Sequence, residues 1–288
     1  MSETSRRVAF VTGASRGIGK VTALTLAARG YSVVLTARTL KTGERFEYSN
    51  VARVSDFKTM PGSLEVTERA IRSAGGEAYS IRMDLLDRDS IHAAVRDAES
   101  VWGGIDVLVN NAIYQGPGTM DTVLDLRVED LERLFLGNVV NQLALVQAVL
   151  PSMLERGRGC IVNMVSQAAM MDPPRPTGQG GWGYGYASSK AAFLRLAGVL
   201  AVEHAGQGVR FVNVEPGFVL TETMEERGLT EQFAKQWGGA PPEVPAAVIA
   251  WLADDPEAEA WQGKTVHAQE LCKKLGLLEG WPPAAGTG

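Results

Sequence analysis

Tyr186 and Lys190 are residues whose types and spacing could carry proton chemistry. They stand four positions apart in Tyr-Ala-Ser-Ser-Lys, which opens a long apolar stretch with a helical pattern. Residues four apart on a helix share one face, so the phenol and the amine can lie together. A tyrosine with an ordinary pKa of about 10 is a poor base at neutral pH, but a nearby ammonium favours the phenolate. The pair indicates a tyrosine general acid or base, although the same spacing also occurs on ordinary helix faces.

A glycine-rich segment, Thr12–Gly19, could bind phosphate. It reads Thr-Gly-Ala-Ser-Arg-Gly-Ile-Gly and lies between an apolar run and a helical pattern at Lys20–Arg29. Glycines permit a tight turn and let backbone N–H groups approach a pyrophosphate at the N-terminus of the following helix. In this strand–turn–helix context we expect a dinucleotide site, although many glycine-rich segments are only turns. The contacts expected from this turn are Gly13, Ser15, Arg16, Gly17, Ile18 and Gly19.

Arg38 indicates which dinucleotide would bind. It ends the second apolar run, nineteen residues after Gly19. A carboxylate near this position would bind the ribose hydroxyls of NAD, whereas a guanidinium binds a 2′-phosphate through charge-assisted hydrogen bonds. Arg16 can reach the same phosphate. The sequence therefore predicts NADP(H) as the cofactor, and the alternative is a pair of solvated surface arginines.

The elements that must position these residues alternate between short apolar runs and helix-length segments. This order predicts an α/β fold: a doubly wound, Rossmann-type parallel sheet of about seven strands, with helices on both faces, in a single domain. The apolar runs are Val8–Thr12, Tyr31–Thr36, Ala78–Met83, Val107–Asn110, Cys160–Val165, Val209–Val214 and, more weakly, Lys264–Ala268.

Three connections are long for a compact domain. The insertion at 40–63 is polar, and we expect it to be irregular. The segment at 170–185 is rich in Pro and Gly, and the segment at 217–245 contains a helical piece around Glu222–Trp237. Because long loops are often lids or binding loops, the last two are the expected substrate loops.

Composition favours a small-molecule partner. The 288 residues carry a net charge of −5 with no long basic run, which argues against a nucleic-acid surface. Neither the two cysteines nor the three histidines have a metal-binding spacing, so no metal site is expected. The residues before the first strand are too few and too polar for the apolar core of a signal peptide, so we expect none, and no segment approaches the about 20 apolar residues that span a bilayer. We expect a cytoplasmic protein with no membrane partner.

Taken together, the motifs resemble those of the short-chain dehydrogenase/reductase family from about Val8 to Thr221. Each motif alone is modest, but their shared order is specific. They are the glycine-rich turn at Thr12–Gly19, Asn-Asn-Ala at Asn110–Ala112, Ser166 after the fifth strand, Tyr186 with Lys190, and Pro216-Gly217. The resemblance implies an NADP(H)-dependent enzyme that interconverts a ketone and a secondary alcohol.

The resemblance also implies roles for single residues. Tyr186 would give a proton to the carbonyl oxygen during reduction or remove one during oxidation, and Ser166 would hydrogen-bond that oxygen. Lys190 would bind the nicotinamide ribose and lower the pKa of the tyrosine. Asn138, in the helix expected at Leu131–Leu150, would hold a water that links Lys190 to solvent. Besides Tyr186 and Lys190, the further cofactor contacts it implies are Asp84 and Leu85 at the adenine, Asn111 and Ala112 along the cleft, and Pro216, Gly217, Val219 and Thr221 at the nicotinamide end.

Several positions depart from the family pattern. Ile113 replaces the usual Gly, and it either narrows the cleft or only packs, with packing favoured. Ser166 and Tyr186 lie twenty residues apart, more than is usual, so Met171–Gly185 should bulge. Tyr184 is a less suitable acid because Ser188, and not a lysine, stands four residues beyond it. The usual Asp-Gly-Gly ending is absent, and Gln269-Glu270-Leu271 stands there instead.

The bulge bears on the substrate. With its Met170, Met171 and Trp182 it is either an apolar wall over a substrate or a solvated loop with one buried Trp. We expect a small neutral or apolar carbonyl or alcohol substrate, and a homodimer or homotetramer by analogy with the family. Two other classes stay open: a nucleotide-binding regulator without turnover, and a lyase or epimerase that uses the same cleft.

Overall fold

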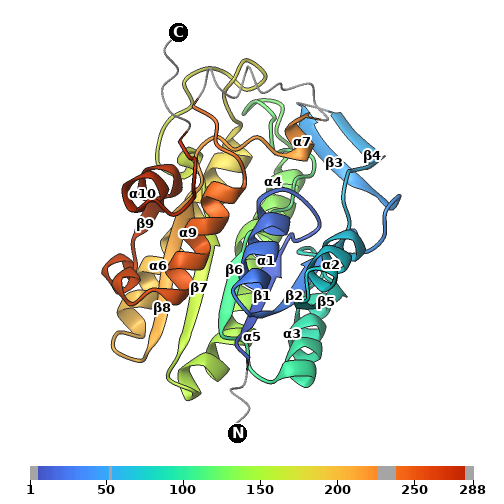
Figure 1. Cartoon of the computed structure of the whole chain (residues 1–288). Helices are drawn as coiled ribbons and strands as arrows, with labels where there is room; N and C mark the ends of the chain where they lie inside the picture. The colour runs from blue at the N-terminus through green and yellow to red at the C-terminus, as the bar shows by residue number, and fades with distance from the viewer. Residues whose placement is uncertain (1–5, 52–53, 226–237, 283–288) are drawn as a thin grey trace, which may run out of the picture.

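One parallel sheet of seven strands organises the chain. The computed structural model describes residues 6–51, 54–225 and 238–282. The strand order is β5-β2-β1-β6-β7-β8-β9 (Figure 1). All seven apolar runs are strands, each within one residue of its predicted ends. Their bounds are β1 (Val8–Thr12), β2 (Ser32–Ala37), β5 (Glu77–Arg82), β6 (Val107–Asn110), β7 (Gly159–Met164), β8 (Val209–Glu215) and β9 (Thr265–His267).

Helices cover both faces of the sheet, as expected for a doubly wound fold. One face packs against α1 (Gly17–Ala28), α2 (Leu64–Ser73) and α9 (Glu243–Asp254), with α10 (Ala268–Leu275) against α9. The other packs against α3 (Arg88–Trp102), α5 (Asn141–Glu155) and α6 (Tyr184–Glu203).

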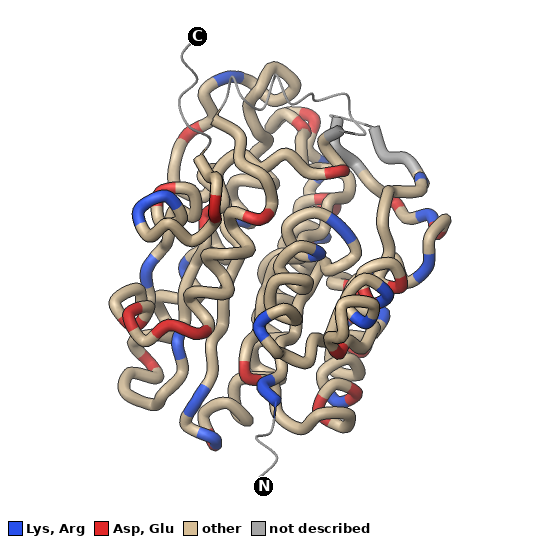
Figure 2. The backbone as a smooth tube through the Cα atoms, viewed as in Figure 1, with Lys and Arg blue, Asp and Glu red and all other residues tan. Residues whose placement is uncertain are grey.

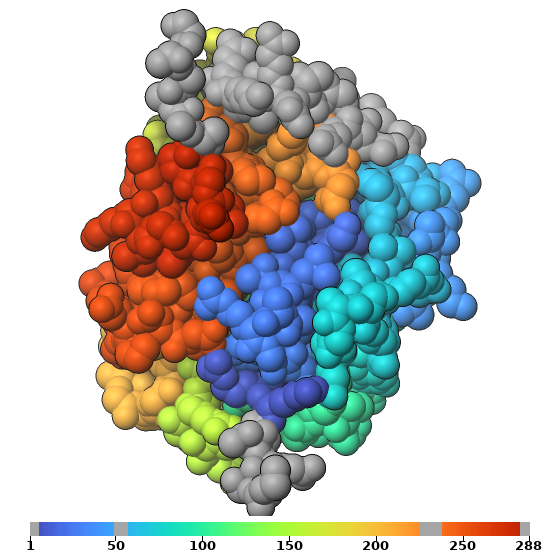
Figure 3. Space-filling model, viewed as in Figure 1, coloured from blue at the N-terminus to red at the C-terminus, as the bar shows by residue number. Residues whose placement is uncertain are grey.

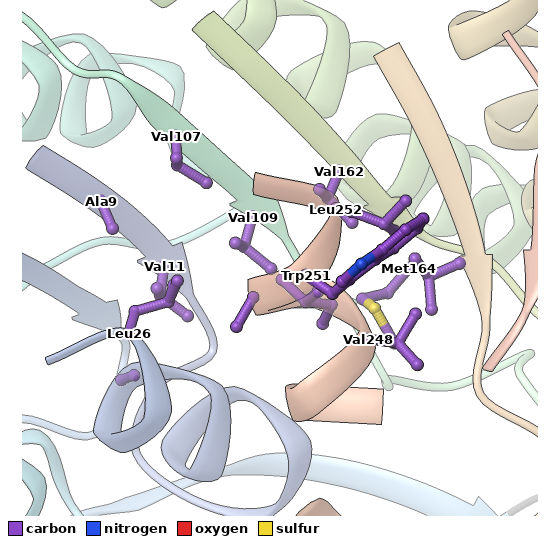
Figure 4. Packing of buried hydrophobic residues seen from close by; sticks show 14 of the residues in the cluster. Ala9, Val11, Leu26, Val107, Val109, Val162, Met164, Val248, Trp251 and Leu252 are labelled. Carbon is purple, nitrogen blue, oxygen red and sulfur yellow. The ribbon is translucent and has the colours of Figure 1, made fainter. Parts of the chain in front are cut away.

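Side chains that alternate along each strand feed the two resulting cores. In β1, Ala9 and Val11 face the α1 side, where Figure 4 shows Val11 beside Leu26, while Val8 and Phe10 face the other core. Basic and acidic residues are interspersed along the chain and do not gather on one side in Figure 2.

The segment Val128–Glu155 is long and apolar enough to cross a membrane by length and composition alone, which our reading of the sequence missed. It is mainly a core helix, because 56% of its most apolar window is buried. The predicted helix at Leu131–Leu150 is interrupted: α4 (Val128–Phe135) passes through a π-helical turn, η1 (Leu136–Val140), into α5. Asn138 lies in that turn, and such turns are frequent at functional sites.

We expected the insertion at 40–63 to be irregular, but it contains a hairpin. Strands β3 (Arg45–Val51) and β4 (Val54–Thr59) pair antiparallel. In β3 the polar residues Arg45 and Glu47 alternate with the aromatic residues Phe46 and Tyr48, which is the period of a half-buried strand. The hairpin lies at the carboxyl edge of the main sheet, above β2 and β5 in Figure 1.

Three short elements complete the description. The 3₁₀ turn η2 (Gln167–Ala169) follows β7, and η3 (Pro256–Trp261) follows α9. In the loop after β8, α7 (Glu222–Glu225) is the start of the predicted helical piece at Glu222–Trp237, and the remainder of that piece lies outside the described residues.

A row of buried asparagine side chains crosses the centre of the sheet. Asn110, Asn163 and Asn213 are register partners on β6, β7 and β8. Asn110 Nδ2 donates to Asn163 Oδ1 at 2.9 Å, and Asn163 Nδ2 donates to Asn213 Oδ1 at 3.4 Å. Asn213 Nδ2 also donates to the Leu194 carbonyl of α6 at 2.8 Å. The row therefore ties the central strands to the helix that carries Tyr186.

Replacing Asn163 by Ala should lower the free energy of unfolding by about 2–4 kcal/mol, because Asn110 and Asn213 would each keep a buried amide group without its partner. Urea unfolding measures this difference. Gln207→Ala, which removes an exposed amide, is the control and should change stability by less than about 0.5 kcal/mol. Equal stability of the two variants would mean that the row contributes nothing.

Candidate active site

Helix α6 places Tyr186 and Lys190 on its buried face. Both lie in its first two turns, on the same side as Phe193 and Ala197, which face the core. Lys190 is 4% exposed, and its Nζ donates to the Met164 carbonyl at the end of β7 at 2.7 Å. Tyr186 is half-buried. The amine and the phenol therefore lie at the carboxyl edge of the sheet.

Ser166 meets Tyr186 from β7. It follows the strand by two residues and opens η2, where its Oγ accepts from the Ala168 N–H at 3.3 Å. The Ser166 side chain lies close enough to the Tyr186 phenol to lower its pKa. The long separation in sequence is thus closed in space, because η2 packs against α6 while the intervening residues loop out.

Burial controls the protonation of both groups on α6. It raises the pKa of Tyr186; the nearby Ser166 hydroxyl lowers this pKa, and the Glu215 carboxylate raises it. Burial lowers the pKa of Lys190 to about 7. We expected the charge of Lys190 to lower the pKa of Tyr186, but burial raises this pKa instead. Tyr186 is therefore a protonated phenol at neutral pH, suited to donating a proton.

Asn138 uses both ends of its side-chain amide to hold the loop after β6. Its Oδ1 accepts from the Tyr114 N–H at 2.6 Å, and its Nδ2 donates to the Tyr114 carbonyl at 3.2 Å. The side chain thereby fixes the segment that follows Asn111 and Ala112. The role implied for Asn138 in holding a water stays a prediction.

The glycine-rich turn packs closely against the Asn-Asn-Ala segment. Asn111 Nδ2 donates to the Thr12 carbonyl at 2.8 Å, and Thr12 Oγ1 accepts from the N–H groups of Asn111 and Ala112 at 2.9 Å. A Cβ on Gly19 would lie 2.4 Å from both the Gly13 carbonyl oxygen and Asn111 Nδ2. Glycine is required at position 19 because the backbone itself fills that space.

A carboxylate lies where the turn would bind an anion. Glu222 Oε2 accepts from the Gly17 N–H at 2.8 Å, and its Oε1 contacts Lys20 Nζ at 3.2 Å. Helix α1 has no acidic residue in its first turn and no side-chain cap. The backbone N–H groups of that turn can therefore bind an anion from elsewhere, such as the Glu222 carboxylate or a phosphate. Burial raises the pKa of Glu222, but its hydrogen bonds, including that from Gly17, leave it lowered.

A cavity lies beside this turn at the carboxyl edge of the sheet. Many of the predicted cofactor contacts line it: Gly13, Ser15, Arg16, Arg38, Asp84, Leu85, Asn111, Ala112 and Thr221. Ile113 also lines it, although we favoured a purely packing role for this residue. Among the other predicted contacts, Gly17, Ile18 and Gly19 lie in α1, Tyr186 and Lys190 in α6, and Pro216, Gly217 and Val219 in the loop after β8.

The two arginines at the cavity are held by the protein. Arg16 donates to the Pro61 carbonyl at 2.7 Å and to Thr39 Oγ1 at 3.1 Å, and burial lowers its pKa. Arg38 lies over the Phe46 ring, 5.2 Å from its centroid. Both side chains are half-buried, so neither is a freely solvated surface arginine.

The unusual C-terminal sequence supports the loop after β8, where the nicotinamide end of the cofactor is expected. Gln269 Nε2 donates to the Pro216 carbonyl at 3.4 Å and to the Phe218 carbonyl at 3.1 Å. Glu215 Oε1 accepts from the Gly217 N–H at 2.8 Å. Gln269, which replaces part of the usual family ending, thus anchors this loop directly.

The bulge between Ser166 and Tyr186 does not form a wall beside the reactive pair. Met170, Met171 and Trp182 line a groove together with Tyr184 and Ala187. On a helix of 3.6 residues per turn, the α6 positions in this groove lie opposite the face that carries Tyr186 and Lys190. The expectation of a solvated loop with one buried Trp is the nearer one, because residues 171–176 and 178–180 are exposed while the Trp182 indole N–H is buried.

Sequence reasoning missed several residues that surround the cavity. The hairpin contributes Phe46, Tyr48, Lys58 and Met60, and the loop after β6 contributes Gln115. The alternation in β3 was the signal that could have revealed the hairpin. Nothing local indicated that Glu222 would reach Gly17, because their contact spans 205 positions in sequence.

Comparison with known proteins relates these features to a family. The family model for short chain dehydrogenase matches residues 7–59 and 49–232. A 3-oxoacyl-(acyl-carrier-protein) reductase from a Synechocystis strain is 32% identical over 270 residues, covering 93% of this chain and 97% of the relative.

Two crystal structures are also similar. A putative short-chain dehydrogenase/reductase from Burkholderia xenovorans has a TM-score of 0.73 at 26% identity and covers 91% of this chain and 94% of its own. A metagenomic short-chain oxidoreductase in complex with NADP has a TM-score of 0.68 at 30% identity, and the match covers 91% of this chain and 96% of the other.

The lowered pKa of Lys190 should appear as a pH dependence of stability. The pKa of this lysine is about 7 in the fold against an ordinary value of 10.5. Between these two pH values the unfolded chain binds more protons than the folded chain. The free energy of unfolding therefore increases with pH across this range, by up to about 1.4 kcal/mol per pH unit. Urea unfolding at about pH 7.5 and 9, without nucleotide, should show this gain for the parent chain and for the exposed-lysine control Lys264→Met but not for Lys190→Met. Identical pH slopes in all three would contradict it.

Replacing Glu222 by Gln should strengthen the binding of ADP, a probe that carries the pyrophosphate. The carboxylate competes for the Gly17 N–H and repels an incoming phosphate, so its removal should tighten binding by about two- to fivefold. Calorimetric titration measures this, with Glu243→Gln as a control that removes an exposed charge elsewhere. Unchanged or weaker binding by the Glu222 variant would show that Glu222 does not compete.

Proposed function

The chain belongs to the short-chain dehydrogenase family of oxidoreductases, and from this we propose that it interconverts a ketone and a secondary alcohol with NADP(H). The observation that carries the proposal is the proximity of the Ser166 and Tyr186 side chains, with Lys190 one helical turn away on the buried face of α6. Such a pair can bind one carbonyl oxygen and protonate it.

The residues around the cavity fit a dinucleotide phosphate. The N-terminus of α1 already holds an anion, the Glu222 carboxylate, on the Gly17 N–H. Close backbone packing at Gly19 shapes the turn, and Arg16 and Arg38 supply positive charge at the far end. Here Gly13–Gly19 would hold the pyrophosphate, and the two arginines would hold the 2′-phosphate. NADPH, when bound, supplies the hydride that reduces the carbonyl carbon.

The protein's own groups supply the proton and the orientation. Ser166 would donate a hydrogen bond to the carbonyl oxygen and hold it next to the Tyr186 hydroxyl. Tyr186, protonated at neutral pH because burial raises its pKa, would donate its proton to that oxygen as the alcohol forms. Lys190, with a pKa of about 7, can be charged or neutral near neutral pH and is suited to returning a proton to the phenolate. Asn138 would act indirectly, by holding the loop after β6 in place.

A 3-oxoacyl thioester is the first substrate to test. The Synechocystis relative is named for the reduction of such a group on acyl-carrier protein. The reacting ketone of this group is neutral, which agrees with the substrate expected from the sequence. Neutral ketones without a thioester form the second test class.

Tyr186→Phe should lower the rate of NADPH-dependent reduction of an acetoacetyl thioester by about 10²–10⁴-fold, because it removes the proton donor. NADPH oxidation measures the rate, and NADH in parallel tests the cofactor. Tyr184→Phe is a matched control, because this tyrosine lies on the outer face of α6 and is 54% exposed. It should keep the parent rate.

Three outcomes would contradict the proposal. Equal rates for the two tyrosine variants would remove Tyr186 from the mechanism, and equal use of NADH would remove the NADP(H) preference. Tight NADPH binding without net consumption on any ketone would favour a regulator, or a lyase or epimerase.

A further inference from the structure

The β3–β4 hairpin is attached to the glycine-rich turn at its base. Arg16 Nε donates to the Pro61 carbonyl just after β4, at 2.7 Å. Gly62 has a φ of +83°, and a Cβ there would lie 2.3 Å from the Ser15 carbonyl oxygen. Only glycine permits this combination of backbone conformation and close approach. The return of the hairpin is therefore fixed against the residues expected to bind phosphate.

The hairpin also reaches the opposite wall of the cavity. The Tyr48 hydroxyl donates to the Gln115 side chain in the loop after β6, and Glu47 pairs with Arg133 of α4 at 3.4 Å. In Figure 3 the light-blue hairpin lies beside the blue residues of α1 and the orange residues after β8. It thus spans the cavity from β2 to α4.

The hairpin brings a third cation to the cavity. Lys58 lines it together with Arg16 and Arg38, and Lys58 Nζ lies 5.6 Å from the centroid of the Tyr48 ring. Within the described part of the chain, Lys58 forms no ion pair. The Lys58 ammonium therefore lies near an aromatic ring, and its charge is not neutralised by a neighbouring carboxylate.

The carboxylates at the cavity are engaged elsewhere. Glu44 accepts from the N–H groups of Leu40 and Lys41 and pairs with Arg82. Asp84 Oδ1 accepts from the Leu86 N–H at 2.9 Å. The cations of the cavity are thus left to attract an external anion.

The two arginines leave room for a further phosphate ligand. Part of the Arg16 guanidinium is hydrogen-bonded to Pro61 and Thr39, and the Arg38 guanidinium lies over the Phe46 ring. A phosphate monoester carries a charge between −1.5 and −2 at neutral pH and accepts several charge-assisted hydrogen bonds. We propose that the β3–β4 hairpin closes the adenosine end of the cofactor site and that Lys58 is a specificity-determining ligand of the 2′-phosphate. This inference rests on the proposed NADP(H) site.

Binding of two nucleotide fragments tests the proposal without relying on turnover. Adenosine 2′,5′-bisphosphate and adenosine 5′-monophosphate differ only by the 2′-phosphate. Lys58→Met should weaken binding of the bisphosphate by about tenfold or more, because it removes one charge-assisted contact, and should change monophosphate binding by less than about twofold. Calorimetric titration of the full chain measures both.

Two further variants separate the outcomes. Lys41→Met removes an exposed lysine from the same insertion, outside the cavity, and should leave both affinities unchanged. Lys58→Arg keeps the charge and should retain most of the preference for the bisphosphate.

Each contrary binding result would refute a different step of the proposal. If the parent chain binds the two fragments equally well, the proposed cofactor is wrong. If the parent prefers the bisphosphate but Lys58→Met keeps that preference, the cofactor stands and the role of Lys58 is refuted. Equal weakening of both fragments would also refute it, because Lys58 would then support the pocket without selecting the phosphate.

Discussion

The direction in which the sheet is wound decides where chemistry can occur. Strand order reverses between β1 and β6, so the loops that leave these two neighbouring strands diverge and open a crevice at their carboxyl ends. The loop after β1 is the glycine-rich turn, and the loop after β6 carries Asn111 and Ala112. Ser166 and Glu215 approach the same edge from β7 and β8. Residues far apart in sequence thereby share one site, and disrupting the sheet would dismantle all of it.

The site also depends on polar groups that are costly to bury. An amine as deep as that of Lys190 persists because it donates to the Met164 carbonyl and because its charge is easily lost at neutral pH. Asn138 is satisfied at both ends by Tyr114, within a helix that departs from α geometry at that point. The same low hydration that destabilises these groups keeps Tyr186 protonated. Stability and proton chemistry at this edge therefore have one physical origin.

Local patterns predicted the main sheet well, because strands buried on both faces are continuous apolar runs and each stands between helices. They failed where the outcome depends on distant partners. Predicting the hairpin would have required recognition of its alternating aromatic residues and knowledge of the residues that it faces across the cavity. The bulge with Trp182 had a composition suited to covering a substrate, but it packs against the outer face of α6. Ile113 and Glu222 owe their positions at the cavity to long-range contacts that no short window of sequence contains.

The most direct test of the account is to follow a deuterium label from NADPH to product. NADPH with deuterium at both positions of the reactive nicotinamide carbon would be incubated with an acetoacetyl thioester and the parent enzyme, and the product examined by mass spectrometry and NMR. A ketone reductase should place one deuterium on the carbinol carbon of the 3-hydroxy product for each NADPH consumed. Product formed without the label at that carbon, or no product under conditions in which NADPH is bound, would contradict a ketone reductase.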